Sequence, residues 1–188
     1  LVPIIGTNME SKENNILELF CEYPTKEWHF EEILTVSSLS RDKANKWLKR
    51  FEKEGLIKRI KEKGKMPYYL GNYDNPAYKN RKRLYALTRF YESGFLNHLQ
   101  SLKKADTIII FGSFARSDWV KESDVDIFVY GNCDDLNISK YEKILKRDIQ
   151  LFNANTKEDL KKMGAGLIKN IIRGNVIKGT FDFLEVSV

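Results

Sequence analysis

One stretch decides the fold of this chain, namely Thr107-Ile-Ile-Ile-Phe-Gly-Ser-Phe-Ala-Arg-Ser-Asp-Trp-Val-Lys-Glu-Ser-Asp-Val-Asp-Ile-Phe-Val-Tyr-Gly131. It begins with an apolar run, Ile108–Phe111, that predicts a buried strand. Gly112 and Ser113 interrupt the run, and a helix is expected to start within Phe114–Trp119. Glycine lets a backbone approach a phosphate closely, and the free N–H groups of a helix start favour an anion. This first half of the stretch therefore indicates a phosphate cradle.

The second half of the stretch carries two carboxylates at the entrance of another apolar strand, Val125–Tyr130. Side chains alternate along a strand, so Asp124 and Asp126 are expected on one face. Two carboxylates at such a short separation repel each other unless a cation lies between them, and Mg²⁺ suits such oxygen ligands. A Gly-Ser pair is usually only a turn, and Asp-x-Asp is usually a solvated strand end. Their combination, about a dozen residues apart and each joined to a strand, indicates a nucleotide site.

These residues resemble a known family. Gly112-Ser-Phe-Ala-Arg116, followed by Ser123-Asp-Val-Asp-Ile127, is similar to the signature of the DNA polymerase beta-like nucleotidyltransferase superfamily, in particular its minimal members. Their pattern is Gly-Ser-x-Ala-Arg-Gly, a spacer, and Ser-Asp-x-Asp-Leu, so Ser117 replaces the second glycine. The resemblance covers about Ala105 to the C-terminus.

The resemblance implies roles for individual residues. Gly112, Ser113 and Arg116 would bind the phosphates of a nucleoside triphosphate, although an arginine on this helix often forms a structural pair instead. Asp124 and Asp126 would be the catalytic ligands of Mg²⁺ in a two-metal site.

The resemblance also implies a third metal-binding carboxylate, on the strand Asp148–Asn153. If Asp148 is the third metal ligand the triad is complete but shifted, and if Gln150 stands there the site lacks a ligand. We expect Gln150 at that position, with slow or absent transfer.

Charge is distributed unevenly over the 188 residues, whose net charge is +6. Residues 1–104 hold 20 Lys and Arg against 13 Asp and Glu, whereas residues 105–188 hold 12 against 13. This difference predicts two domains with different partners, of which the basic one would bind a polyanion.

The cysteine spacing and the apolar runs of the sequence indicate the cellular compartment of the protein. Cys21 and Cys133 lie far apart without metal or redox spacing, which predicts reduced thiols. No secretory signal or bilayer-length apolar run is visible, so a cytoplasmic protein without membrane contact is expected. Residues Leu1–Asn8 precede Met9 and are interpreted as an expression remnant.

The first half predicts three short helices and a hairpin. Helices are expected over Asn14–Glu22 and Glu31–Thr35, with a brief strand at Trp28–Phe30 between them. A third helix follows the N-cap Ser40 and ends before Gly55. Two strands are then expected, over 56–61 and 66–70.

This order, with the run Lys46-Trp-Leu-Lys-Arg-Phe-Glu-Lys-Glu-Gly-Leu-Ile-Lys-Arg59, is similar to a winged helix-turn-helix domain. The resemblance implies that the third helix enters the major groove of double-stranded DNA and that the hairpin rests on the backbone. A solvated Lys-rich helix or a protein-interaction module are the alternatives. The residues implied in DNA binding are Arg41, Asn45, Lys46, Lys49, Arg50, Lys63 and Lys65.

The remaining pattern completes an α+β chain. One long aromatic helix over Ala77–Leu102 is expected to pack against both domains or against a second copy of the chain, so a homodimer is one expected assembly. Helices over 137–146, 157–163 and 167–173, the strand 148–153 and an edge strand at 176–179 complete a mixed sheet. The predicted domains are a winged helix at 9–73, a connecting helix at 77–103 and a nucleotidyltransferase domain at 105–188.

Two functions stay open from the sequence. One is an enzyme that transfers a nucleoside monophosphate to a hydroxyl acceptor. The other is a DNA-binding regulator, or an antitoxin-like protein as some small family members are, whose nucleotidyltransferase domain is weakly active or inactive.

Overall fold

The structure is a computed structural model that describes residues 10–184, so the expected remnant Leu1–Asn8 lies outside the described residues. The chain divides into two compact units, with the division between Lys82 and Arg83. This division falls inside helix α4 (Pro76–Glu92), which therefore contributes one end to each unit. Tyr78 near the start of α4 and Phe90 near its end are both buried.

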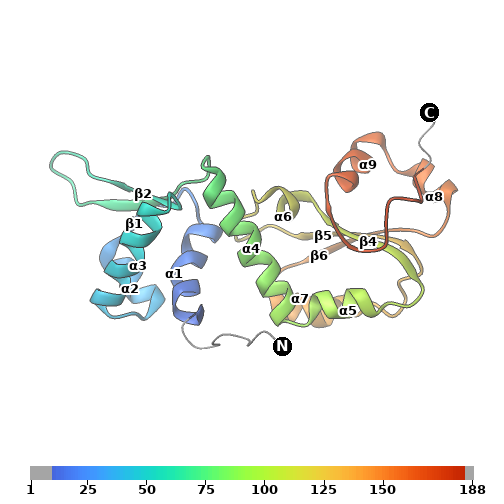
Figure 1. Cartoon of the computed structure of the whole chain (residues 1–188), viewed down its shortest axis with the longest axis horizontal. Coiled ribbons are helices and arrows are strands. Elements are labelled where there is room, and N and C mark those ends of the chain that lie inside the picture. Colours follow the sequence, from blue (N-terminus) through green and yellow to red (C-terminus); the bar gives the residue numbers. More distant parts are fainter. Residues whose placement is uncertain (1–9, 185–188) are drawn as a thin grey trace, which may run out of the picture. The chain divides into compact units, whose positions relative to one another are not determined.

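The first unit is a small helical domain with a three-stranded antiparallel sheet (Figure 1). Its strands lie in the order β1-β3-β2, so the last strand of the unit is the central one. Its elements before α4 are α1 (Glu10–Glu22), β1 (Trp28–His29), α2 (Phe30–Ser37), α3 (Arg41–Lys53), β2 (Ile57–Ile60) and β3 (Tyr68–Gly71). Each expected element of this half is present, within a few residues of its predicted ends.

Helix α3 shows why this half folds as its pattern predicts. Ala44, Leu48 and Phe51 recur at helical spacing and are all buried. Ser40 is the N-cap residue in an extended conformation, and Gly55 follows the helix with a φ of +73°. The remaining faces of α3 carry its charged side chains into solvent, which leaves the basic surface of the helix open.

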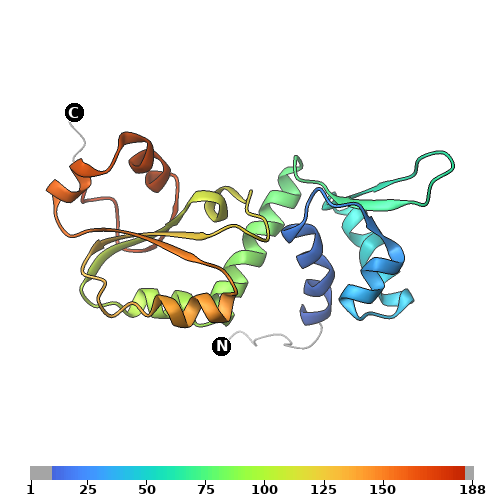
Figure 2. The same ribbon diagram turned by 180° about the vertical axis from the view of Figure 1, so that it is seen from behind.

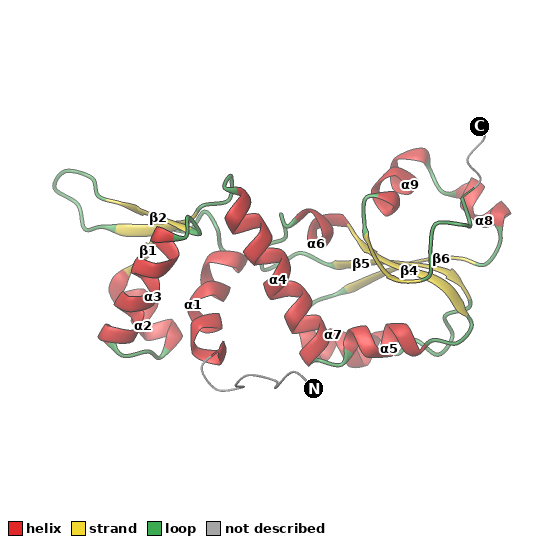
Figure 3. Cartoon of the chain, in the orientation of Figure 1, coloured by secondary structure: helices red, strands yellow, loops and turns green. Residues whose placement is uncertain are grey.

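The second unit is built on a four-stranded mixed sheet in the order β6-β5-β4-β7 (Figure 3). Strand β4 pairs antiparallel with both β5 and β7, and β5 pairs parallel with β6. Its elements after α4 are α5 (Phe95–Ser101), β4 (Ala105–Phe111), α6 (Gly112–Arg116), β5 (Val125–Gly131), α7 (Ile138–Leu145), β6 (Ile149–Ala154), α8 (Lys157–Lys162), α9 (Ala165–Ile172) and β7 (Asn175–Lys178).

Helices cover both faces of this sheet (Figures 1 and 2). Helices α5 and α7 lie along one face, where the rings of Phe95 and Tyr141 are 5.0 Å apart. Helices α8 and α9 cover the other, where Leu160 and Ile171 pack in one cluster with Phe128 of β5. Strands β4 and β5 are buried on both faces, which explains why they appear in the sequence as continuous apolar runs.

Two sequence predictions about helices are wrong in part. The single helix expected over 77–102 is broken between α4 and α5, because Gly94 adopts a φ of +75° at the start of α5. The helix expected within Phe114–Trp119 begins earlier and has five residues, since Ser117 turns left-handed with a φ of +64° and ends it. The motif helix α6 is therefore a single turn between β4 and the loop that leads to β5.

Both cysteines are free thiols, and Cys21 is fully buried, which raises its pKa to about 12. Within residues 10–184, no helix combines the length and the apolarity needed to cross a membrane.

Candidate active site

The site forms where β4 ends and β5 begins, because these neighbouring strands run antiparallel. Phe111, the last residue of β4, lies opposite Asp126 in the register of the two strands. Gly112 and Ser113, which directly follow Phe111, are therefore brought to the carboxylates at the entrance of β5. The two halves of the sequence motif therefore meet at one end of these two central strands.

Gly112 lies directly against the side chain of Asp126. Its φ is +67°, and any Cβ on this residue would overlap with Oδ2 of Asp126. Two constraints thus require glycine here, namely the left-handed backbone and the carboxylate that occupies the space of a side chain. The Gly-Ser turn is consequently shaped around Asp126 and is more than a connection between strands.

Asp126 is an electrostatically strained carboxylate. Its pKa is raised above the usual value, first by partial burial and then by the charge of Asp124, whereas Arg116 acts in the opposite direction. A cation beside the pair would relieve both effects, because it would replace lost hydration and neutralise the repulsion. The donor chemistry of Asp124 and Asp126 therefore fits a hard divalent cation.

Gln150 stands on β6 directly beside Asp126 in the parallel register. Its Nε2 donates a hydrogen bond of 2.7 Å to Oδ2 of Asp124. Asp148 directly precedes β6, and its backbone carbonyl accepts a hydrogen bond from the N–H of Val125 at 2.9 Å. The side chain of Asp148 is exposed. Among residues 10–184 no group of three or more His, Cys, Asp or Glu side chains is arranged to hold one metal ion, Asp124, Asp126 and Asp148 included.

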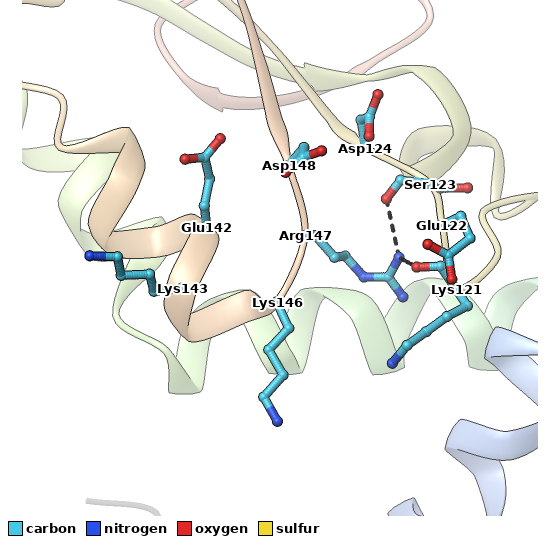
Figure 4. Close-up of a pocket in the computed structure, with 9 residues that line it drawn as sticks. All are labelled: Lys121, Glu122, Ser123, Asp124, Glu142, Lys143, Lys146, Arg147 and Asp148. Carbon is cyan, nitrogen blue, oxygen red and sulfur yellow. Dashed lines mark hydrogen bonds between the residues drawn. The ribbon is translucent and has the colours of Figure 1, made fainter.

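A cavity of about 370 Å³ opens beside Asp124 (Figure 4). Its walls come from the loop before β5, from α7 and from the turn before β6. Arg147, which the sequence analysis did not single out, crosses this cavity toward the loop before β5. No local signal distinguishes it, because it directly follows another basic residue, Lys146, in the turn between α7 and β6. The lining residues are Lys121, Glu122, Ser123, Asp124, Glu142, Lys143, Lys146, Arg147 and Asp148.

The other two expected phosphate ligands lie on α6. Nε of Arg116 donates to Oδ2 of Asp118 at 2.8 Å, and both side chains are half exposed. Ser113 is partly exposed, and its carbonyl accepts the N–H groups of Ser117 and Asp118 that close the turn. Arg116 is thus held in a structural pair, which is the alternative that the sequence left open, and its charge still acts on Asp126.

The candidate DNA-binding residues all lie in the first unit, on α3 and on the turn between β2 and β3. Three of the seven are engaged in ion pairs, Arg41 with Glu31, Arg50 with Glu54 and Lys65 with Glu62. The other four side chains are exposed, and they are Asn45, Lys46, Lys49 and Lys63. Asn45 also lines an apolar cleft of about 570 Å³ between α2, α3 and the hairpin.

The comparisons with known proteins agree with the geometry of the second unit. Residues 93–177 match the family model described as "Nucleotidyltransferase domain". No curated protein and no solved structure matches the chain. The matched residues run from the end of α4 to β7 and include the Gly-Ser turn, the acidic pair and Gln150. Within the second unit, residues 93–177 therefore match a nucleotidyltransferase domain.

Proposed function

We propose that the second unit binds a nucleoside triphosphate together with Mg²⁺ and transfers a nucleoside monophosphate to a hydroxyl acceptor. The single observation that carries this proposal is the contact of Gly112 with the Asp126 carboxylate. It joins a turn without a side chain, suited to phosphate, to an acidic pair suited to a cation. The family match to residues 93–177 supports the same chemistry at a coarse level.

Each residue of the site has a separate task in this proposal. Asp124 and Asp126 would hold Mg²⁺, which when bound supplies charge neutralisation for the triphosphate and lowers the pKa of the attacking hydroxyl. Gly112 lets the backbone approach the phosphates, and Ser113 offers its hydroxyl to them. In the transfer, the acceptor hydroxyl would release its proton to water and its oxygen would bond to the α-phosphorus. The bond from phosphorus to the bridging oxygen would break, and pyrophosphate would leave with those electrons.

The position of Gln150 suggests that this transfer is slow. Its amide lies beside Asp126 and donates to Asp124, whereas a carboxylate there would add a third negative ligand. An amide oxygen is a weaker ligand than a carboxylate for a hard cation, and the lost ligand would chiefly weaken the ion that activates the nucleophile. This observation favours the second candidate function, a protein that binds Mg²⁺-nucleotide but is weakly active or inactive as a transferase.

Calorimetry of the full chain with Mg²⁺ and each of ATP, CTP, GTP and UTP tests the binding step. We expect saturable binding that Asp124→Ala and Asp126→Ala abolish. Asp135→Ala is the matched control, because Asp135 is an exposed aspartate beyond the opposite end of β5. Unchanged binding in both site variants would show that the pair is only a solvated strand end. Labelled nucleotides with Mg²⁺ then reveal whether protein, RNA or a small molecule receives the monophosphate.

We also propose that the first unit is a winged helix that binds double-stranded DNA. The proposal rests on three helices followed by an antiparallel hairpin, and on the exposed basic side chains of α3. Each Lys that neutralises a phosphate releases a counterion, so log K should fall against log salt with a slope of about −0.9 per contact. Replacing Lys46 and Lys49 with Glu should flatten this slope, whereas the exposed Lys161→Glu in the second unit should not. An equal effect of both changes would contradict this assignment.

A further inference from the structure

Arg147 binds the loop that delivers Asp124 to the site. Its Nη1 donates to the carbonyls of Val120 at 2.8 Å, Lys121 at 2.6 Å and Ser123 at 3.1 Å. Figure 4 shows this side chain reaching from the turn before β6 to the loop before β5. The loop has no regular secondary structure, and it ends at Asp124. One guanidinium nitrogen thus gathers the backbone immediately before the first carboxylate.

The same guanidinium also contacts the Gly-Ser half of the motif. Its Cζ lies 5.4 Å from the ring centroid of Phe114 and 5.1 Å from that of Trp119. These two rings stack on each other at 5.1 Å with an interplanar angle of 7°. Phe114 follows Ser113 directly on α6, so Arg147 joins the phosphate turn, the acidic loop and the entrance of β6. A planar cation that stacks on aromatic faces while its N–H groups donate in the plane is chemistry that arginine supplies and lysine does not.

We infer that Arg147 is the positioning residue of this site, and that it fixes Asp124 for cation binding. The inference rests on the proposed function. Asp124 and Asp126 repel each other, so the irregular loop that carries Asp124 needs a restraint to keep the two carboxylates together. Arg147 provides it through the three carbonyls, and the backbone bond from Val125 to the carbonyl of residue 148 fixes the next residue. Arg147 acts through this loop and has no assigned contact with substrate.

The test compares Arg147→Met, which keeps the apolar stem and loses all donors, with Arg147→Lys, which keeps the charge. Asn153→Ala is the matched control. Asn153 also donates to two backbone carbonyls of β5, those of Val129 at 3.1 Å and Gly131 at 2.7 Å, but at the far end of the strand. It should reduce stability without disturbing the acidic pair. All variants are studied as the full chain.

Amide hydrogen exchange in metal-free protein gives the first readout. We expect exchange within residues 120–124 to be about ten times faster in Arg147→Met and intermediate in Arg147→Lys, and to be unchanged in Asn153→Ala. The second readout is the affinity for Mn²⁺ with ATP. Loss of a supporting contact to a ligand typically costs about 10- to 100-fold, so Arg147→Met should weaken binding at least about ten-fold.

The two readouts separate this inference from the proposed function. If the wild type does not bind Mn²⁺ with ATP, the proposed function is overturned, and the exchange data alone decide whether Arg147 holds the loop. If exchange in residues 120–124 rises no more in Arg147→Met and Arg147→Lys than in Asn153→Ala, the inference is overturned. If exchange rises in both Arg147 variants but their affinity for Mn²⁺ with ATP stays at the wild-type value, Arg147 holds the loop without affecting cation binding at Asp124. This outcome also overturns the inference.

Discussion

Replacing Ser117 with glycine should stabilise the second unit, although Ser117 is almost completely buried. The residue ends α6 in the left-handed region, with a φ of +64° and a ψ of +25°. Only 3% of its surface is exposed, and its Oγ has no hydrogen-bond partner. The sequence pattern that this motif resembles has glycine at this position. Ser117 therefore combines a strained backbone with a buried, unsatisfied hydroxyl.

The expected magnitude follows from three contributions. Relief of the left-handed strain contributes about 1 kcal/mol. Removal of a buried hydroxyl without a partner contributes about 1–2 kcal/mol. The greater conformational freedom of glycine in the unfolded chain lowers the free energy of unfolding by about 0.5–1 kcal/mol. The free energy of unfolding should therefore rise by about 1–2.5 kcal/mol in Ser117→Gly, and each kcal/mol raises the Tm of a unit of this size by about 4–8 °C.

Urea unfolding, with the midpoint and the m-value fitted separately, measures this change. Ser117→Ala removes the hydroxyl and keeps the strained Cβ, so it should recover only part of the gain. Ser38→Gly is the matched control, because Ser38 is also left-handed, with a φ of +54°, but is exposed. It should change stability by less than about 0.5 kcal/mol. The reasoning is refuted if Ser117→Gly gains no more than Ser38→Gly, or if Ser117→Ala is destabilised.

Three further predictions concern the acidic pair. Gln150→Glu should raise any rate of nucleotidyl transfer by about ten-fold or more, because it adds a carboxylate beside Asp126, whereas Asp148→Asn should change the rate little. Transfer of labelled nucleotides measures both rates. If the wild type is a fast transferase and Asp148→Asn abolishes its activity, Asp148 is the third ligand. The raised pKa of Asp126 means that its favourable contribution is present at low pH and is lost as the pH rises through that pKa. Asp126→Asn should thus have a higher Tm than wild type at pH 7 in EDTA, with the difference closing toward about pH 4, and a lower Tm at pH 7 would oppose this account. Gly112→Ala should cost about 2–4 kcal/mol in urea unfolding, less in the background of Asp126→Ala, and an additive double mutant would exclude steric overlap with the Asp126 carboxylate as its cause.

The sequence determined the parts of this protein that depend on short-range patterns. The helical spacing of Ala44, Leu48 and Phe51 predicts α3 because the periodicity alone decides which face is buried. The apolar runs at 108–111 and 125–130 predict β4 and β5 because a short continuous apolar run is typical of a strand that is buried on both faces. The Gly-Ser and Asp-x-Asp spacing brings the site together as soon as these two strands pair. The break at Gly94 was missed, because an isolated glycine within a helical pattern is often tolerated.

Only the tertiary structure decided what stands beside the acidic pair. Whether residue 148 or residue 150 lies next to Asp126 depends on the register of two strands that are separate in sequence. A shift of two residues would bring Asp148 to this position on the same face, and the sequence contains no local signal that distinguishes the two registers. The role of Arg147 depends on a loop and two rings that come from other segments. Such contacts have no period and no local composition, so they exist only once the chain has folded and brought those segments into contact.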